Sequence, residues 1–219
     1  MVNVQAARTA GVKAGLTRGA VLEAALALVD AEGIERLSMR RLAATLDVEA
    51  QSIYNHIANK QDLIDGVVEI VLAPAIGISV EVSWGERLTE HLRGIRQQFV
   101  EHPRAYDLVL QASTRSVAIG RTTTQLLAIL EEAGLEGWQQ RQAFTMITSA
   151  LDGFVIGERF RSRMGAIPDD LPEEFAELPA FFGALEQDGA TAHFEAVITR
   201  LRDAVADMNV GRASPLMKS

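Results

Sequence analysis

The chain has 219 residues, of which 48% are hydrophobic, 23% are charged and none is cysteine. This composition is typical of a globular protein with a real core, and it excludes disulfides and thiolate metal sites. A reducing cytosol is the compartment we expect. No stretch approaches the roughly 18 uninterrupted apolar residues of a membrane-spanning helix. The basic N-terminal residues are not followed by the apolar segment of a secretory signal.

The net charge of −8 is unevenly distributed. Residues 1–60 carry a slight excess of Lys and Arg over Asp and Glu, whereas residues 61–219 carry a large acidic excess. A mildly basic head on an acidic body is compatible with phosphate contact at one end only. We therefore expect no nucleic acid on any other face of the protein.

The pattern of apolar residues predicts an all-α protein, because helical periodicity recurs along the chain and strand-like alternation does not occur. The helices expected in chain order cover about Thr17–Glu32, Met39–Leu46 after the N-cap Ser38, Ala50–His56, a segment opened by Asn59 and Lys60, Trp84–Glu101, Arg104–Ala112, Ser116–Ala133, Trp138–Arg163 and Thr191–Met208. Pro74–Ser83 is expected to be a hinge, and the acidic, Pro-containing segment Ile167–Leu178 a mobile loop.

Four segments follow from this pattern. Residues 1–15 and 211–219 are expected to be flexible tails. Residues 16–73 form a predicted DNA-binding domain, built on a three-helix helix-turn-helix, and residues 74–210 form a predicted helical domain for ligand binding and dimerisation. The boundary between the two lies at Pro74.

The segment Leu37–Lys60 is the most informative part of the chain, because two short apolar-periodic helices flank a tight turn at Asp47. This is the sequence pattern of a helix-turn-helix DNA reader. Asp47 stands where a left-handed residue is needed, and Asp tolerates that conformation better than most residues with a side chain.

The second of these helices has the residues that base reading requires. Gln51, Ser52 and Asn55 share one face, while Ile53 and Ile57 share the opposite face. Gln and Asn pair bidentately with adenine, and Ser is a less selective partner. The alternative is that each polar residue is only a solvated surface position. That alternative does not explain why several such residues are arranged together on a helix-turn-helix.

Phosphate contacts are expected around this face. The candidates are Tyr54, His56 and Lys60 at the start of the next helix. Arg40 near the Ser38 cap and Arg18 from the first helix are each placed to contact a phosphate or to reach a base. Tyr54 and His56 could instead be half-buried packing residues.

The region Leu16–Leu72 resembles the TetR family of bacterial repressors. The matching segments are LTRGAVLEAALALVDAEGIERLSMRRLAATLDV and SIYNHIANKQDLIDGVV, and the second half has weaker similarity to the tetracycline-repressor subgroup in SWGERLTEHLRGIRQQFVEHPRA and LLAILEEAGL. The resemblance implies an all-α homodimer that binds a palindromic operator and releases it when a small molecule binds the C-terminal domain. By the same resemblance, the DNA contacts are Arg40, Gln51, Ser52, Tyr54, Asn55, His56 and Lys60.

Two positions depart from the family pattern. Asp47 replaces the usual turn glycine, and Asn55 stands where an aromatic residue is common. The operator sequence is therefore not transferable from the family.

The effector site is expected where helices of the second domain leave a mostly apolar space with a few polar groups. The candidate lining residues are Leu88, His91, Ile95, Phe99, Val109, Leu126, Phe144, Thr148, Leu151 and Asp152. Many of the apolar ones could be plain core, and His91 could be a surface or satisfied core residue. Val109 occupies the position where tetracycline-binding relatives place a metal-coordinating His, so we expect an apolar effector, no magnesium–tetracycline, no metal site and no cofactor.

The long Trp138 helix and the last helix are the expected dimer elements, because two such helices from each subunit form a four-helix bundle. The candidate interface residues are Gly153, Phe154, Gly157, Val197, Leu201 and Val205. The alternative is that these stripes pack only inside one subunit.

Three other classes of protein remain as alternatives. A small helical enzyme is disfavoured because the four His residues are scattered and no H-E-x-x-H, G-x-S-x-G, P-loop or G-x-G-x-x-G motif occurs. A DNA-binding activator or nucleoid factor without an effector would need fewer C-terminal helices. A protein-binding scaffold would show no affinity for duplex DNA.

Overall fold

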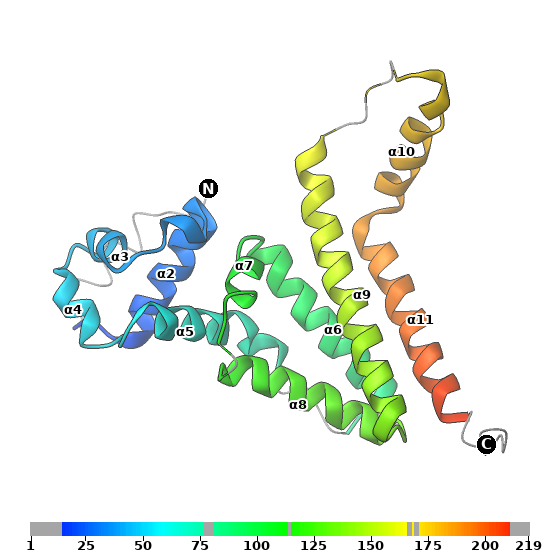
Figure 1. Cartoon of the computed structure of the whole chain (residues 1–219), viewed down its shortest axis with the longest axis horizontal. Helices are drawn as coiled ribbons and strands as arrows, with labels where there is room; N and C mark the ends of the chain where they lie inside the picture. The colour runs from blue at the N-terminus through cyan, green and yellow to red at the C-terminus, as the bar shows by residue number, and fades with distance from the viewer. Residues whose placement is uncertain (1–14, 77–80, 114, 166–167, 169–170, 211–219) are drawn as a thin grey trace. The chain divides into compact units, whose positions relative to one another are not determined.

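The computed structural model describes residues 15–76, 81–113, 115–165, 168 and 171–210, and every regular element in these ranges is helical (Figure 1). In chain order the elements are α2 (Arg18–Glu32), η1 (Ile34–Arg36), α3 (Met39–Leu46), α4 (Ala50–Tyr54), α5 (Lys60–Leu72), η2 (Ala73–Ala75), α6 (Trp84–Glu101), α7 (Tyr106–Val109), α8 (Val117–Glu132), α9 (Gly137–Met164), η3 (Glu173–Phe175), α10 (Leu178–Asp188) and α11 (Ala190–Val210). The all-α prediction is confirmed. The two predicted tails lie outside the described residues, apart from Gly15.

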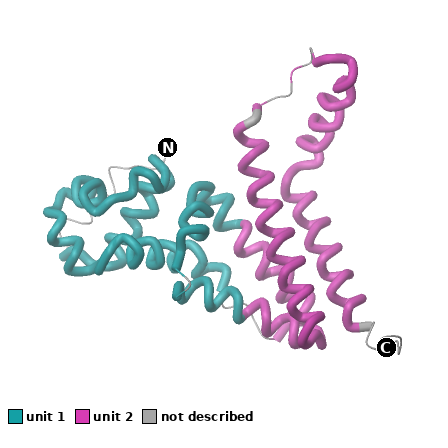
Figure 2. The backbone as a smooth tube through the Cα atoms, in the orientation of Figure 1, with its two compact units in different colours: residues 1–77, 97–124 teal, residues 78–96, 125–219 magenta. Residues whose placement is uncertain are grey.

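The chain divides into two compact units that are discontinuous in sequence (Figure 2). Unit 1 comprises residues 1–77 and 97–124, and unit 2 comprises residues 78–96 and 125–219. Both α6 and α8 are therefore shared between the units. The predicted division was a single boundary at Pro74. The two compact units differ from it, because α7 and the adjoining parts of α6 and α8 belong with the N-terminal helices.

The helices of unit 1 begin where short polar side chains cap them. The Thr17 side chain accepts a hydrogen bond from the Ala20 amide, and Ser38 and Asn59 cap α3 and α5 in the same way. Each cap satisfies an amide that has no partner within its helix. The predicted N-cap Ser38 and the predicted helix start at Asn59 are confirmed.

The turn before α4 is confirmed, whereas the length of α4 is not. Asp47 ends α3 in the left-handed conformation with φ 55°, and its amide bonds to the Ala43 carbonyl. Helix α4 ends at Tyr54, two residues earlier than predicted. The chain tightens there, because the His56 amide bonds to Ile53, only three residues back.

In unit 2, α9 and α11 lie side by side (Figure 1). Their buried side chains include Ile147, Val155, Phe194 and Ile198. Helix α10 was not predicted, although it has a proline in its first turn and ends at Gly189 with φ 80°. Within the described residues, no helix combines the length and hydropathy needed to cross a membrane.

Candidate nucleic-acid interface

Helix α4 presents two different faces. Ile53 and Ile57 are 0% and 1% exposed, and they anchor the segment to the core of unit 1. Tyr54 is 48% exposed, and Gln51 and Asn55 are exposed with it. Ser52 and His56 are half-buried at the edge of this face. The predicted separation of a packing face from an outward polar face is therefore present, and Tyr54 is not a packing residue.

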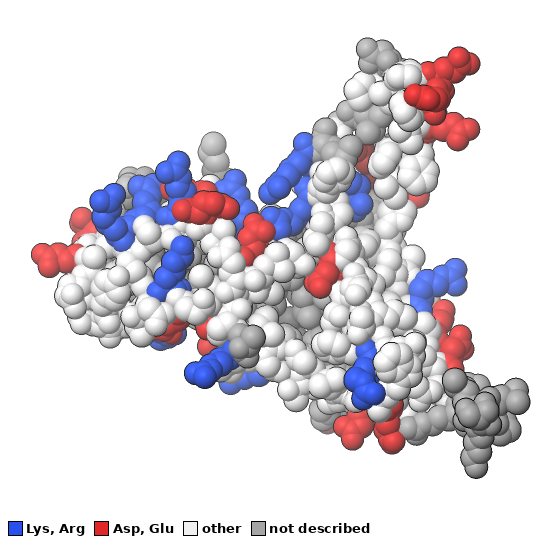
Figure 3. All heavy atoms as spheres, in the orientation of Figure 1, with Lys and Arg blue, Asp and Glu red and all other residues white. Residues whose placement is uncertain are grey.

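Unit 1 carries exposed basic residues on the helices before and after α4, and the exposed acidic residues Asp47 and Glu49 directly before α4. Figure 3 shows Lys and Arg side chains over the end of unit 1 that carries α2 and α3. Arg40 on α3 and Lys60 at the start of α5 are exposed. Arg41 is exposed as well, and its guanidinium pairs with Glu32. Exposed cations beside an exposed polar helix face can neutralise phosphates while the helix approaches the bases.

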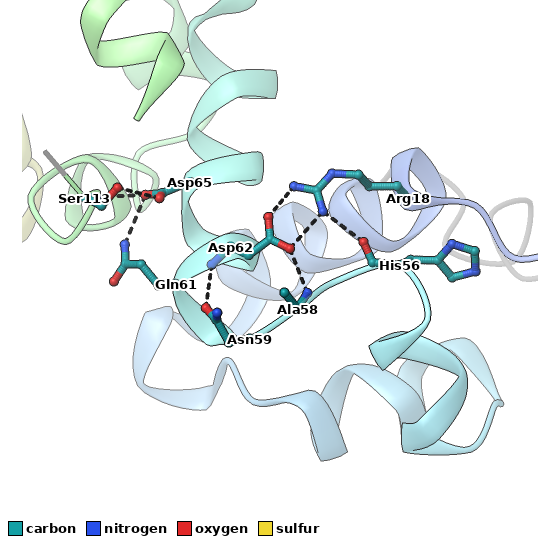
Figure 4. Close-up of polar contacts among 8 residues, drawn as sticks. All are labelled: Arg18, His56, Ala58, Asn59, Gln61, Asp62, Asp65 and Ser113. Carbon is teal, nitrogen blue, oxygen red and sulfur yellow. Dashed lines mark hydrogen bonds and ion pairs between the residues drawn. The ribbon is translucent and has the colours of Figure 1, made fainter. Parts of the chain in front are cut away.

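Arg18 is exposed at the surface, and its guanidinium forms hydrogen bonds with other residues of unit 1 (Figure 4). Its guanidinium donates to both carboxylate oxygens of Asp62, at 2.6 and 3.0 Å, and to the His56 carbonyl at 2.9 Å. The hydrogen bond from Arg18 holds the pKa of Asp62 below its ordinary value, and Asp62 raises the pKa of Arg18. Figure 4 shows the His56 ring pointing away from this cluster.

A second polar cluster was missed by the sequence analysis. The Asp65 carboxylate on α5 accepts hydrogen bonds from the amide and hydroxyl of Ser113, at 2.8 and 2.6 Å. Gln61 donates to Asp65 (Figure 4), and it also donates to the Gln111 carbonyl. Burial raises the pKa of Asp65, but the hydrogen bonds from Ser113 and Gln61 outweigh it, so that the pKa lies below its ordinary value. These residues are about fifty positions apart, so no local pattern could reveal the contact.

In unit 2, buried polar atoms of Arg87, His91 and Gln125 lack a hydrogen-bond partner among the described residues, and Arg87 pairs with Glu132 through another of its nitrogens. His91 is 2% exposed, and its Nδ1 finds no hydrogen-bond partner among the described residues. The Gln125 Nε2 is likewise buried and unpaired in the described part of the chain. Buried polar atoms without partners are costly, so each needs an explanation. Gln125 was not among the predicted site residues, because a glutamine on an amphipathic helix gives no sequence signal.

The other predicted effector-site residues fall into several environments. Three of them are buried in unit 2, namely Leu88, Leu126 and Leu151. Three more are half-buried in unit 2, namely Ile95, Phe144 and Thr148. The remaining ones are Phe99 and Val109, which belong to unit 1, and Asp152, which is exposed on α9. The prediction of one apolar lining therefore needs correction at Asp152, whose side chain lies at the surface. Phe99 packs edge-on against Tyr106 at 5.2 Å between ring centroids, so it is core of unit 1. No three His, Asp or Glu side chains in the described ranges gather in a way that could hold a metal ion.

Three of the predicted dimer residues line one groove of about 640 Å³ in unit 2, namely Phe154, Val197 and Leu201. Gly153 is exposed beside it and Gly157 is half-buried under Arg161. Val205 is 0% exposed, so its side chain packs within the protomer and the prediction for it needs correction.

The fold and this geometry define a helix-turn-helix DNA-binding protein: a capped helix, a left-handed turn and a second helix with an outward polar face. Residues 21–67 match the family model of "Bacterial regulatory proteins, tetR family". Residues 79–207, more than half of the chain, match "Tetracyclin repressor-like, C-terminal domain". The chain belongs to the TetR family of transcriptional regulators.

Individual relatives agree with this assignment. An HTH-type transcriptional regulator of Saccharopolyspora erythraea is 29% identical over 192 residues, which cover 82% of this chain and 80% of the relative. The HTH-type transcriptional repressor DrrR1 of Streptomyces coeruleorubidus is 30% identical over 151 residues, which cover 67% of this chain and 54% of the repressor. The crystal structure of Mycobacterium smegmatis BioQ matches this chain with a TM-score of 0.68 and 27% sequence identity. The match covers 88% of this chain and 99% of BioQ.

Proposed function

We propose that this protein is an effector-responsive repressor that acts in the cytoplasm as a homodimer on a palindromic operator. The outward polar face of α4 is the observation that carries the proposal. Related proteins support it, because one relative is named a repressor and BioQ, at 27% identity, has been crystallised with its double-stranded DNA operator. We assign no catalytic role, since this family consists of transcriptional regulators.

In this proposal, base edges are read from α4 and phosphates are held around it. Gln51, Ser52 and Asn55 face the bases, because amide and hydroxyl groups can pair with base edges in the major groove. Arg40, Tyr54, His56 and Lys60 take the backbone contacts, which fix the register of the helix on the duplex. The exposure of Tyr54 and Lys60 supports these roles.

Substitutions of Lys60 and Tyr54 distinguish a charged from a neutral contact with the DNA backbone. Lys60→Ala is expected to weaken operator binding and to lower the slope of log Kobs against log salt by about 0.9 for each phosphate that is no longer neutralised, or roughly twice that in a dimer. Tyr54→Ala is expected to weaken binding by about tenfold with the slope unchanged, because a neutral side chain releases no counterion. Binding titrations at several salt concentrations measure both effects.

Glu23→Gln on the exposed face of α2 is a suitable control, since it alters a surface charge outside the proposed interface. Thermal unfolding of each variant checks that the fold is retained. Wild-type affinity for both Tyr54→Ala and Lys60→Ala would remove these residues from the interface.

A second copy of the chain is the proposed occupant of the groove in unit 2. Phe154, Val197 and Leu201 line it, and α9 also carries the exposed apolar side chains Ile156 and Phe160. Exposed apolar side chains grouped at one surface are typical of a protein interface. The dimeric habit of the family supports this occupant.

His91 and Gln125 are the proposed polar anchors of the effector. Burial lowers the pKa of His91 to about 4, so the ring is neutral at physiological pH and offers an acceptor as well as a donor. The neighbouring predicted residues Leu88 and Leu126 are apolar. The effector class that fits is a largely apolar, uncharged molecule with at least one hydroxyl or carbonyl group.

His91→Leu is expected to keep operator binding and to raise the effector concentration needed for release by at least about tenfold, since the variant cannot make the buried hydrogen bond to the effector. A library of apolar hydroxyl- and carbonyl-bearing compounds, screened for release of labelled operator, supplies the probe. Thr145→Val on the exposed face of α9 is the control. An unchanged response of His91→Leu to a compound that releases the wild type would refute the anchor.

A further inference from the structure

The recognition helix is too short to hold itself in place. Helix α4 has five residues, and no side chain caps its N-terminus. Helices of this length are unstable without tertiary contacts. Ile53 and Ile57 anchor one side of it by apolar packing. Apolar packing alone leaves the direction of the C-terminal end weakly defined.

Polar contacts hold that C-terminal end. Arg18 from α2 donates to the His56 carbonyl at 2.9 Å, and Asp62 from α5 accepts from the Ala58 amide at 2.8 Å. Arg18 and Asp62 are joined to each other by two further hydrogen bonds. Figure 4 shows the four groups converging just beyond α4. The chain leaving α4 is thereby tied to α2 at His56 and to α5 at Ala58.

Gly66 leaves room for this arrangement. A Cβ atom at Gly66 would lie 3.1 Å from Arg18 Nη2 and 2.7 Å from the buried Leu22 Cδ2. Glycine is a poor helix former, yet Gly66 lies inside α5, one turn after Asp62. Its presence is explained by the close approach of α2 and the Arg18 guanidinium.

We propose that Arg18 is a positioning residue that acts with Asp62 to aim the recognition helix, and that it is not a DNA contact. This replaces the phosphate contact predicted for Arg18 from the sequence, and it rests on the DNA-reading function proposed above. The pair fixes residues 56–58, and through them the direction in which Gln51 and Asn55 point. The Arg18 side chain is 44% exposed, so direct contact with phosphate is the rival explanation.

The two explanations differ in measurable ways. We would determine operator affinity at several salt concentrations for Arg18→Ala, Asp62→Ala and the double variant. Asp62→Asn keeps an acceptor for Ala58 and serves as a second variant if Asp62→Ala folds poorly. Arg121→Ala is the matched control, because it breaks the exposed ion pair between Arg121 and Glu69 with the same change of charge.

The positioning role predicts that Arg18→Ala and Asp62→Ala each lower affinity by about tenfold, and that the double variant binds no more weakly than either single one. The salt slope stays at the wild-type value, because the number of neutralised phosphates is unchanged. Thermal stability changes little, since exposed ion pairs contribute little to it. Arg121→Ala binds as the wild type does.

A lowered salt slope in Arg18→Ala, together with normal affinity in Asp62→Ala, would establish a phosphate contact and overturn the proposal. Wild-type affinity in all three variants would overturn it as well. Amide hydrogen exchange in the free protein gives a readout that needs no DNA. Faster exchange at Ala58 in both single variants supports the pair, and unchanged exchange refutes it even if the wild type were to bind no duplex.

Discussion

Ile53→Ala is expected to destabilise the protein by about 2–5 kcal/mol, the usual cost of truncating a fully buried branched side chain. Ile53 is 0% exposed and is the buried residue of α4. Urea unfolding followed by circular dichroism measures the change in the free energy of unfolding.

Tyr54→Ala is the internal comparison, because Tyr54 is the next residue of the same helix and is 48% exposed. Its expected effect on stability is within about 0.5 kcal/mol, since little of its surface is buried. A destabilisation below about 1 kcal/mol in Ile53→Ala would contradict the account of how α4 is anchored.

Acid is expected to destabilise the protein through His91. Burial lowers the pKa of His91 from 6.5 to about 4, so the unfolded chain binds a proton over a pH range in which the folded protein does not. The contribution of His91 to stability is therefore complete above about pH 6.5 and is lost progressively as the pH falls towards 4. At about 1.4 kcal/mol per pH unit, the decrease in stability is roughly 3 kcal/mol.

The measurement is the free energy of unfolding between pH 7.5 and 4, in roughly half-unit steps, for the wild type and for His91→Gln. The variant has no proton to gain at this position, so its stability should fall less over the same range. Parallel curves for the two proteins would show that His91 does not carry the acid dependence. Such a result would also weaken the proposed neutral effector anchor.

Local features of the fold could be predicted because their physics is local. The N-caps Thr17, Ser38 and Asn59 each satisfy the amide three residues further on, and the left-handed turn at Asp47 depends on one residue. The two faces of α4 follow from helical periodicity alone. For the same reasons, the all-α class and most helix bounds were accessible from the sequence.

Features that depend on distant contacts were missed. Arg18 and Asp62 are 44 positions apart, so the sequence indicated an exposed cation at Arg18 but not its ion pair with Asp62. Helix α10 was hidden because its acidic, proline-containing approach reads as a loop, although its apolar residues and Gly189 were visible signals. Val205 was assigned to a dimer surface because its helix has several apolar residues, and only tertiary packing shows which of them point inwards.

The candidate sites show the same limit. Exposure of Gln51 and Asn55 followed from their spacing, whereas the exposure of Tyr54 was left open by the sequence and Ser52 is half-buried. By contrast, Gln125 became a candidate only when its amide was found buried without a partner in the described part of the chain. A missing hydrogen bond leaves no trace in a sequence pattern.

Selection of bound duplexes from a random DNA pool at about 150 mM salt, a physiological ionic strength, tests the central claim most directly. A dimeric reader predicts enrichment of a palindrome whose half-sites are about one helical turn apart. The same palindrome should be enriched with Arg121→Ala, and Tyr54→Ala should bind the selected duplex about tenfold more weakly than the wild type. Absence of enrichment with the wild-type protein, or enrichment of a single unpaired half-site, would contradict the account of this protein as a dimeric operator-binding regulator.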